Sequence, residues 1–139
     1  MRKTRLVIAN EIEGNVIGIV STLKDYKLAW NINQVFSINL VMQPPLVIEF
    51  MKMPNLSITN FLFETEFHVY RLLRNKGSDH NSGYLIPELV NFDFFLMISG
   101  EEGIMPEKKV IDQLQSIKDL DYFQHIDVSR LKSKDNFIF

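Results

Sequence analysis

The sequence predicts a single α+β domain with two layers, in which a mainly antiparallel sheet carries two helices packed on one face. Short apolar runs separated by turn residues indicate strands joined by hairpins, and only two segments have helical periodicity. The middle of the chain offers no helices between its strands, as a doubly wound parallel sheet would require. With 139 residues, the chain has the length of one domain, and we expect 1–139 to fold as one unit.

The first predicted elements are a hairpin and a helix. Residues 6–9 and 16–20 are short runs rich in β-branched residues, with turn residues between them. Thr22 and Asp25 have the spacing of a capping box, which predicts a helix that starts at Thr22. Apolar residues then recur with helical spacing and predict one buried face: Leu28, Ile32, Val35 and Phe36.

Strands dominate the middle of the chain. Three are predicted from apolar runs bounded by proline and polar residues: 46–50, 56–63 and 67–74. A hairpin is expected around 64–66. The polar stretch 75–83 contains glycine and has no periodicity, so we expect a mobile surface loop. Residues 92–99 are almost continuously apolar, which places them in the centre of the sheet.

The C-terminal third predicts a second helix, a last strand and a tail. Pro106 suits a first helical position, and one apolar stripe follows it: Val110, Ile111, Leu114 and Ile117. Residues 121–128 read as a strand, and 129–139 as a tail that ends in Phe137, Ile138 and Phe139. An undocked ring would expose about 150 to 250 Å². We therefore expect the tail to pack on its own domain, on a second copy or on another protein.

Composition excludes several classes of function. Fifteen Lys and Arg against 17 Asp and Glu give a net charge of −2, so no overall positive field attracts nucleic acid. The absence of cysteine excludes disulfides and thiolate metal sites. No apolar run approaches the roughly 18 to 20 residues that cross a membrane. The run at 6–9 is too short for a secretory signal, so we expect a cytoplasmic protein.

No catalytic or metal-binding constellation is evident. His68, His80 and His125 lie far apart in sequence, so we expect neither a metal nor another cofactor. Arg71, Arg74 and Lys76, with Tyr70 nearby, form a local cluster of basic and aromatic residues, which we interpret as an exposed hairpin end. Asp93 stands in an apolar run, and because a buried carboxylate is costly without partners, it must face solvent or accept hydrogen bonds.

A second aromatic feature lies on the first helix. Tyr26 and Trp30, the only tryptophan, are one turn apart on the face opposite Leu28. Large aromatic side chains commonly anchor contacts between proteins. The alternative is that a second core layer or the chain's own loops cover this face, because indole is usually well buried.

Residues 86–94 resemble the signature of the IPExxxVDY family of small bacterial proteins. Four positions match the signature: Ile86, Pro87, Glu88 and Asp93. Phe92 and Phe94 stand in place of the Val and Tyr of the pattern. The resemblance extends to three more segments: 25–33, 99–101 and 131–139. It implies a one-domain bacterial protein and brings no activity, cofactor or catalytic residue. From its position at a bend, Glu88 could accept backbone N–H groups or meet Arg71 or Arg74.

These features favour a non-catalytic protein-interaction or scaffold module, whose occupant is a partner protein or a second copy of the chain. Its candidate anchors are four aromatic residues: Tyr26, Trp30, Phe137 and Phe139. The alternative is a small-ligand or regulatory domain with a pocket that closes on Glu88, Asp93 and Trp30. A third hypothesis is an enzyme that uses acidic residues.

Overall fold

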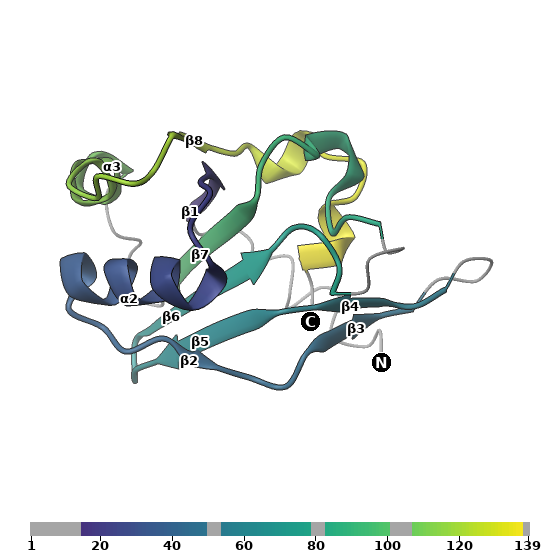
Figure 1. Cartoon of the computed structure of the whole chain (residues 1–139), viewed down its shortest axis with the longest axis horizontal. Coiled ribbons are helices and arrows are strands. Elements are labelled where there is room, and N and C mark those ends of the chain that lie inside the picture. Colours follow the sequence, from purple (N-terminus) through teal and green to yellow (C-terminus); the bar gives the residue numbers. More distant parts are fainter. Residues whose placement is uncertain (1–14, 50–53, 79–82, 101–106, 138–139) are drawn as a thin grey trace.

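The computed structural model describes residues 15–49, 54–78, 83–100 and 107–137, and these residues form the predicted α+β class (Figure 1). The helices are α2 (Asp25–Phe36) and α3 (Glu107–Gln115). The strands are β1 (Asn15–Val20), β2 (Val41–Met42), β3 (Leu46–Ile48), β4 (Leu56–Ile58), β5 (Asn60–Glu64), β6 (His68–Arg74), β7 (Phe94–Gly100) and β8 (Tyr122–His125). Three short 3-10 helices complete these ranges: η2 (Pro87–Leu89), η3 (Val128–Arg130) and η4 (Lys134–Phe137).

Six strands form one antiparallel sheet in the order β2-β5-β6-β7-β1-β8. The central strand is β7, which pairs with β6 from His68↔Gly100 to Arg74↔Phe94 and with β1 on its other side. The prediction of a central strand from the apolar run at 92–99 is therefore confirmed. The hairpin at 64–66 is also confirmed, since it joins β5 to β6.

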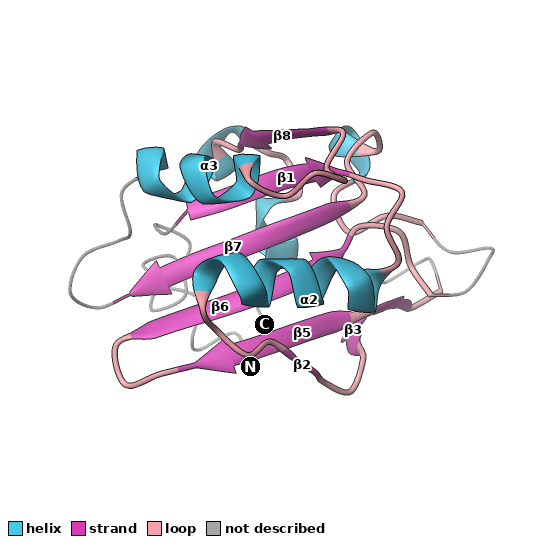
Figure 2. Cartoon of the chain, turned by 60° about the vertical axis from the view of Figure 1, so that its left-hand side comes forward, coloured by secondary structure: helices cyan, strands magenta, loops and turns pink. Residues whose placement is uncertain are grey.

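Both helices cover the same face of this sheet, as predicted (Figure 2). The predicted stripe of α2 is buried at Leu28, Ile32 and Phe36 and partly buried at Val35. These residues pack with Val110 and Leu114 of α3. Beneath them lie strand side chains at alternate positions, which point towards the helices. The front core therefore follows from the helical spacing of apolar residues in the helices and from their alternation in the strands.

The other face of the sheet is also buried. Val16, Leu73 and Phe95 belong to a second core, which three groups of residues cover: β4, the segment 85–92 and the C-terminal 3-10 helices. Because β7 is apolar at consecutive positions, both of its faces need a covering layer. The two-layer expectation thus omitted a back layer that contains strands and 3-10 turns.

The helix start differs from the capping-box prediction. Helix α2 begins at Asp25, its N-cap is Lys24, and no side chain caps it. Ser21, at the end of β1, holds the connection instead: its N–H donates to Asp93 Oδ2 at 2.9 Å and its hydroxyl to Asp119 O at 3.0 Å. Thr22 is exposed. The chain therefore turns before the helix starts, and the capping box was wrong.

The strand predicted at 56–63 is divided at Thr59. Its first half pairs with β3 in a separate two-stranded sheet, and its second half is β5 of the main sheet. Asn60 fixes the change of sheet, because its buried amide donates to Pro44 O and accepts from Arg71 Nη1, both at 3.0 Å. The predicted strand at 6–9 and Pro106 lie outside the described residues.

The C-terminal tail docks on its own domain. Phe137 is 2% exposed, and its ring meets that of Phe95 edge-on, with centroids 5.4 Å apart. This residue therefore belongs to the back core and not to a free surface. Phe139 lies outside the described residues.

We predict that Phe137→Ala lowers the free energy of unfolding by about 3 to 5 kcal/mol, because it leaves a cavity beside Phe95. Chemical denaturation measures this change. Phe67→Ala, which removes a ring that is 45% exposed, should cost less than about 1 kcal/mol. Equal losses in the two variants would show that the tail is not part of the core.

Candidate functional site

The outer side of α2 exposes the predicted aromatic pair. Tyr26 is 56% and Trp30 61% exposed, so neither a core layer nor a described loop covers them. Met42 is also exposed and lies on the same side of the sheet, because its register partner Phe61 packs in the front core. Asn33 accepts a hydrogen bond from Leu40 N–H at 2.7 Å and so ties the approach to β2 against α2. We call Tyr26 and Trp30 the aromatic face.

A cleft of about 500 Å³ opens at one end of the sheet. Its walls come from the connection between β1 and α2, the end of β6 with the residues after it, and the segment that leads into β7. Three basic residues line it: Lys24, Arg74 and Lys76. Asp93 lines it too, whereas Glu88 and Trp30 do not. Of the three residues predicted to share a pocket, this cleft therefore contains Asp93 alone.

The basic cluster read from the sequence is divided between two environments. Arg71 donates to the buried amide of Asn60, whereas Arg74 and Lys76 line the cleft. Lys76 Nζ lies 5.4 Å from the centre of the Tyr84 ring, so Tyr84 replaces Tyr70 as the aromatic neighbour. Lys24 was not part of the predicted cluster, because it lies far from Arg74 in the sequence. Lys24 and Arg74 come together only in the folded chain, so no short sequence motif could predict that they line one cleft.

Asn75 is buried, although the sequence predicted a surface loop from this residue onward. Its side chain satisfies three backbone groups: it donates to Leu89 O at 2.9 Å and Phe92 O at 3.0 Å, and accepts from Ile86 N–H at 2.9 Å. Its own N–H donates to Asp93 O at 2.9 Å. The loop prediction was wrong at this residue, because the amide substitutes for strand partners that the segment 85–92 lacks.

The residues that resemble the family signature make structural contacts. Ile86 is fully buried in the back core, and Pro87 begins η2. Asp93, expected either in solvent or hydrogen-bonded, is both: it is exposed, and Oδ2 accepts from Ser21 N–H. Glu88 Oε2 accepts from Ser133 N–H at 2.9 Å, so of the two expectations for Glu88 it is the backbone contact that forms.

The carboxyl group of Glu88 has a lowered pKa. Partial burial acts in the opposite direction and raises it. The hydrogen bonds from the Ser133 backbone, from its own backbone, from the Ser133 side chain and from the Lys132 backbone together outweigh this effect. The ionised form of Glu88 therefore fastens η2 to the C-terminal segment.

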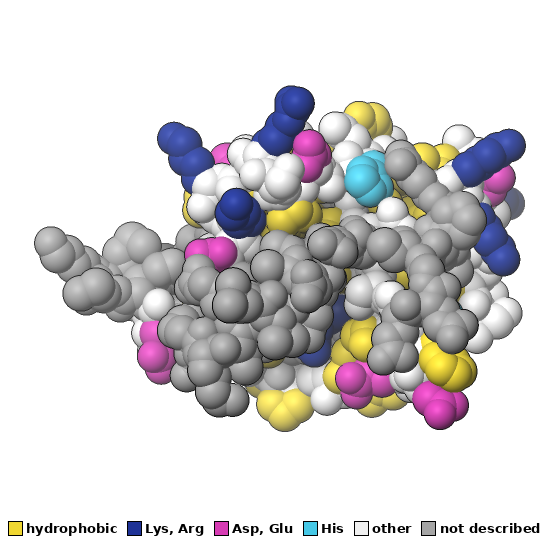
Figure 3. Space-filling view, turned by 180° about the vertical axis from the view of Figure 1, so that it is seen from behind, with side chains coloured by type: hydrophobic (Ala, Val, Ile, Leu, Met, Phe, Trp, Pro, Cys, Tyr) yellow, Lys and Arg dark blue, Asp and Glu magenta, His cyan; other side chains and the backbone are white. Residues whose placement is uncertain are grey.

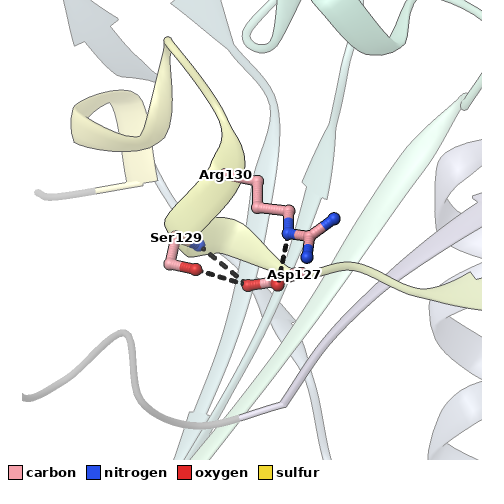
Figure 4. Close-up of polar contacts among 3 residues, drawn as sticks. All are labelled: Asp127, Ser129 and Arg130. Atoms are coloured by element: carbon pink, nitrogen blue, oxygen red, sulfur yellow. Dashed lines mark hydrogen bonds and ion pairs between the residues drawn. The ribbon is translucent and has the colours of Figure 1, made fainter.

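A second lowered pKa belongs to Asp127, which caps η3 (Figure 4). The hydrogen bond from the Ser129 hydroxyl, at 2.6 Å, is the main cause, and the Ser129 N–H, Arg130 and His125 add to it against the effect of desolvation. The Arg130 Nε atom lies 3.3 Å from Asp127 Oδ2. This group acts as a local cap on an exposed turn.

Other chemistry is sparse in the part of the chain that the structure describes. No three His, Asp or Glu side chains there lie close enough together to hold a metal ion. On the face seen in Figure 3, most basic side chains stand near the outline with acidic ones among them, and the visible hydrophobic side chains form separate areas. Among the described residues, we consider two surfaces for a function: the aromatic face and the cleft.

We predict that Asn75→Ala lowers the free energy of unfolding by about 2 to 4 kcal/mol, because it strands buried backbone groups at Ile86, Leu89 and Phe92. Chemical denaturation measures the loss. Asn31→Ala is the matched control, since Asn31 donates one exposed hydrogen bond on the surface of α2. A cost for Asn75→Ala no larger than that of the control would contradict the structural role of this amide.

We predict that Glu88→Gln destabilises the protein at pH 7 by about 0.5 kcal/mol, a small effect because the side chain is exposed. Since the folded-state pKa of Glu88 is lowered, its contribution is complete above the unfolded-state pKa and is lost as pH falls through the folded-state pKa. The difference between variant and parent should therefore shrink as the pH falls below the unfolded-state pKa of Glu88 and disappear once the pH lies below its folded-state pKa. Urea denaturation at pH 7 and through the acid range, with Glu66→Gln as control, tests this. A difference that stays constant through the acid range would mean that the carboxylate is not its source.

None of the helices in the described ranges is both long enough and apolar enough to cross a membrane. No protein-family model matches the chain, and no curated protein is significantly similar to it in sequence.

Proposed function

We propose that this chain is a non-catalytic protein-interaction module whose docking surface is the aromatic face of α2. The observation that supports the proposal is the 61% exposure of Trp30. An indole left in water forgoes a hydrophobic gain of a few kcal/mol, and binding to a partner recovers it. Tryptophan and tyrosine are also enriched among the residues that dominate the energy of protein interfaces.

The charges around the aromatic face indicate the chemistry of the partner. Lys24 and Lys27 are exposed at the start of α2. Asp25 is the only acidic residue of this helix, and its Oδ1 atom accepts from Tyr26 N–H at 2.6 Å. We therefore propose a protein partner with an apolar pocket for the indole and carboxylates at the rim of that pocket.

The proposal includes a cytoplasmic setting and excludes nucleic acid as a partner, in keeping with the net charge of −2. Membership of the IPExxxVDY family also stays a proposal. It adds no activity to the interaction proposed for α2.

We predict that Trp30→Ala weakens binding to this partner by roughly 30-fold or more, since loss of a central tryptophan costs at least about 2 kcal/mol. A protein captured from lysate with the parent chain is purified, and its affinity is measured by calorimetry against parent and variant. Phe67→Ala, which removes an exposed ring from the turn between β5 and β6, should leave the affinity unchanged. Equal affinities for parent and Trp30→Ala would contradict the proposal.

The aromatic face could instead bind a second copy of the chain. Analytical ultracentrifugation of the parent and of Trp30→Ala distinguishes this alternative from a different partner protein. We expect the parent to sediment as a monomer at micromolar concentration. A dimer that Trp30→Ala converts to monomer would assign the aromatic face to self-association in place of a different partner.

A further inference from the structure

The cleft at the end of the sheet has walls that hydrogen bonds hold in place. Asp93 joins three of its parts: its N–H donates to Ile19 O at 2.8 Å, its carbonyl accepts from Asn75 N–H at 2.9 Å, and its carboxylate accepts from Ser21 N–H at 2.9 Å. These bonds fix the end of β1, the residues after β6 and the start of β7 relative to one another. The cleft of about 500 Å³ is therefore formed without a ligand, and its size suits a small organic molecule.

Three cationic side chains line this cleft without a carboxylate partner. Within the described part of the chain, neither Lys24, Arg74 nor Lys76 forms an ion pair or a side-chain hydrogen bond. The two acidic residues of the lining direct oxygens to backbone donors: Asp93 to Ser21 N–H and Asp25 to Tyr26 N–H. The cations thus remain available, although the chain as a whole carries a net charge of −2.

The lining also offers ring surface beside these charges. Tyr84 is partly buried, and Lys76 Nζ lies over its ring at 5.4 Å. Phe92, which is 4% exposed, forms part of the wall and stacks on Tyr122, with centroids 6.3 Å apart. The organic part of a ligand could therefore contact the Tyr84 ring, while its anionic group contacts the cations.

We propose that the cleft binds a small organic anion with a phosphate or carboxylate group, such as a phosphomonoester or a dicarboxylate. Arg74 offers a planar guanidinium that can donate two parallel hydrogen bonds to a phosphate or carboxylate group, and Lys24 and Lys76 add two further positive charges to the lining. The three cations outnumber the two carboxylates of the lining, so the cleft has a net positive charge that favours an anion. Neither Tyr26 nor Trp30 lines this site, although Lys24, which lies near the aromatic face, does.

The test is an NMR titration of the full chain at low salt with three probes: adenosine monophosphate, succinate and inorganic phosphate. We expect adenosine monophosphate or succinate to shift the backbone amides of residues 21–25, 74–76 and 90–94, and to bind more tightly than inorganic phosphate. The first probe identifies a phosphomonoester site and the second a dicarboxylate site. Raising the salt concentration should weaken the binding, since the site is open to solvent.

Charge-matched variants locate the site. Arg74→Gln should weaken binding roughly tenfold or more, the loss expected for a charge-assisted hydrogen bond. Lys24→Gln should weaken it as well, and it gives a second test at an exposed side chain that makes no packing contact in the core. Lys27→Gln removes the same charge from α2 outside the cleft and should leave the affinity within a factor of about two.

Three results would overturn the proposal. The first is that none of the probes shifts the named amides. The second is that inorganic phosphate binds as tightly as the organic anions, which would mean that the Tyr84 ring adds nothing. The third is that Lys27→Gln weakens binding as much as Arg74→Gln, which would indicate diffuse attraction to a positive surface.

Discussion

The back layer of the fold depends on one buried amide side chain, that of Asn75. Residues 85–92 run across the sheet with few strand partners of their own, so their backbone groups need acceptors and donors inside the protein. The Asn75 side chain supplies hydrogen-bond partners for the backbone of Ile86, Leu89 and Phe92. A buried group that replaces this many backbone contacts is costly to lose, because each orphaned partner stays out of water. The covering of the back core and the position of the cleft wall follow from this one side chain.

The regular elements were predictable because their periodicity reflects burial directly. The stripe that begins at Leu28 and the continuous apolar run of β7 each report which faces need covering, and the structure covers those faces. Asn75 was not predictable in the same way. An asparagine beside Lys76 and Gly77 has the composition of a turn, and nothing local reveals that its amide will serve residues more than ten positions away.

The same limit applies to the helix start and to the cleft. Thr22 has the right spacing for a capping box, but Ser21 is bound to Asp93 and Asp119, and this tertiary demand decides where the helix can begin. Lys24 belongs to that same connection, so its place in the cleft results from the contact between Ser21 and Asp93. Arg74 reaches the cleft from the end of another strand. A binding surface assembled from separate connections leaves no motif in the sequence.

The sequence offered two aromatic features as anchors for a partner, one on the first helix and one in the C-terminal tail, and packing distinguishes them. The ring of Phe137 meets Phe95 because the back face of β7 needs a cover, whereas nothing in the described chain lies over the outer side of α2 at Trp30. Packing also explains the residues of the signature-like segment 86–94. Phe92, in place of a smaller valine, fits because Gly18 has no side chain: a Cβ atom there would lie 2.7 Å from the Phe92 ring. Ile86 is likewise enclosed in the back core. Ile86 and Phe92 of the signature-like segment therefore build the back layer, whereas Asp93 of the same segment lines the cleft.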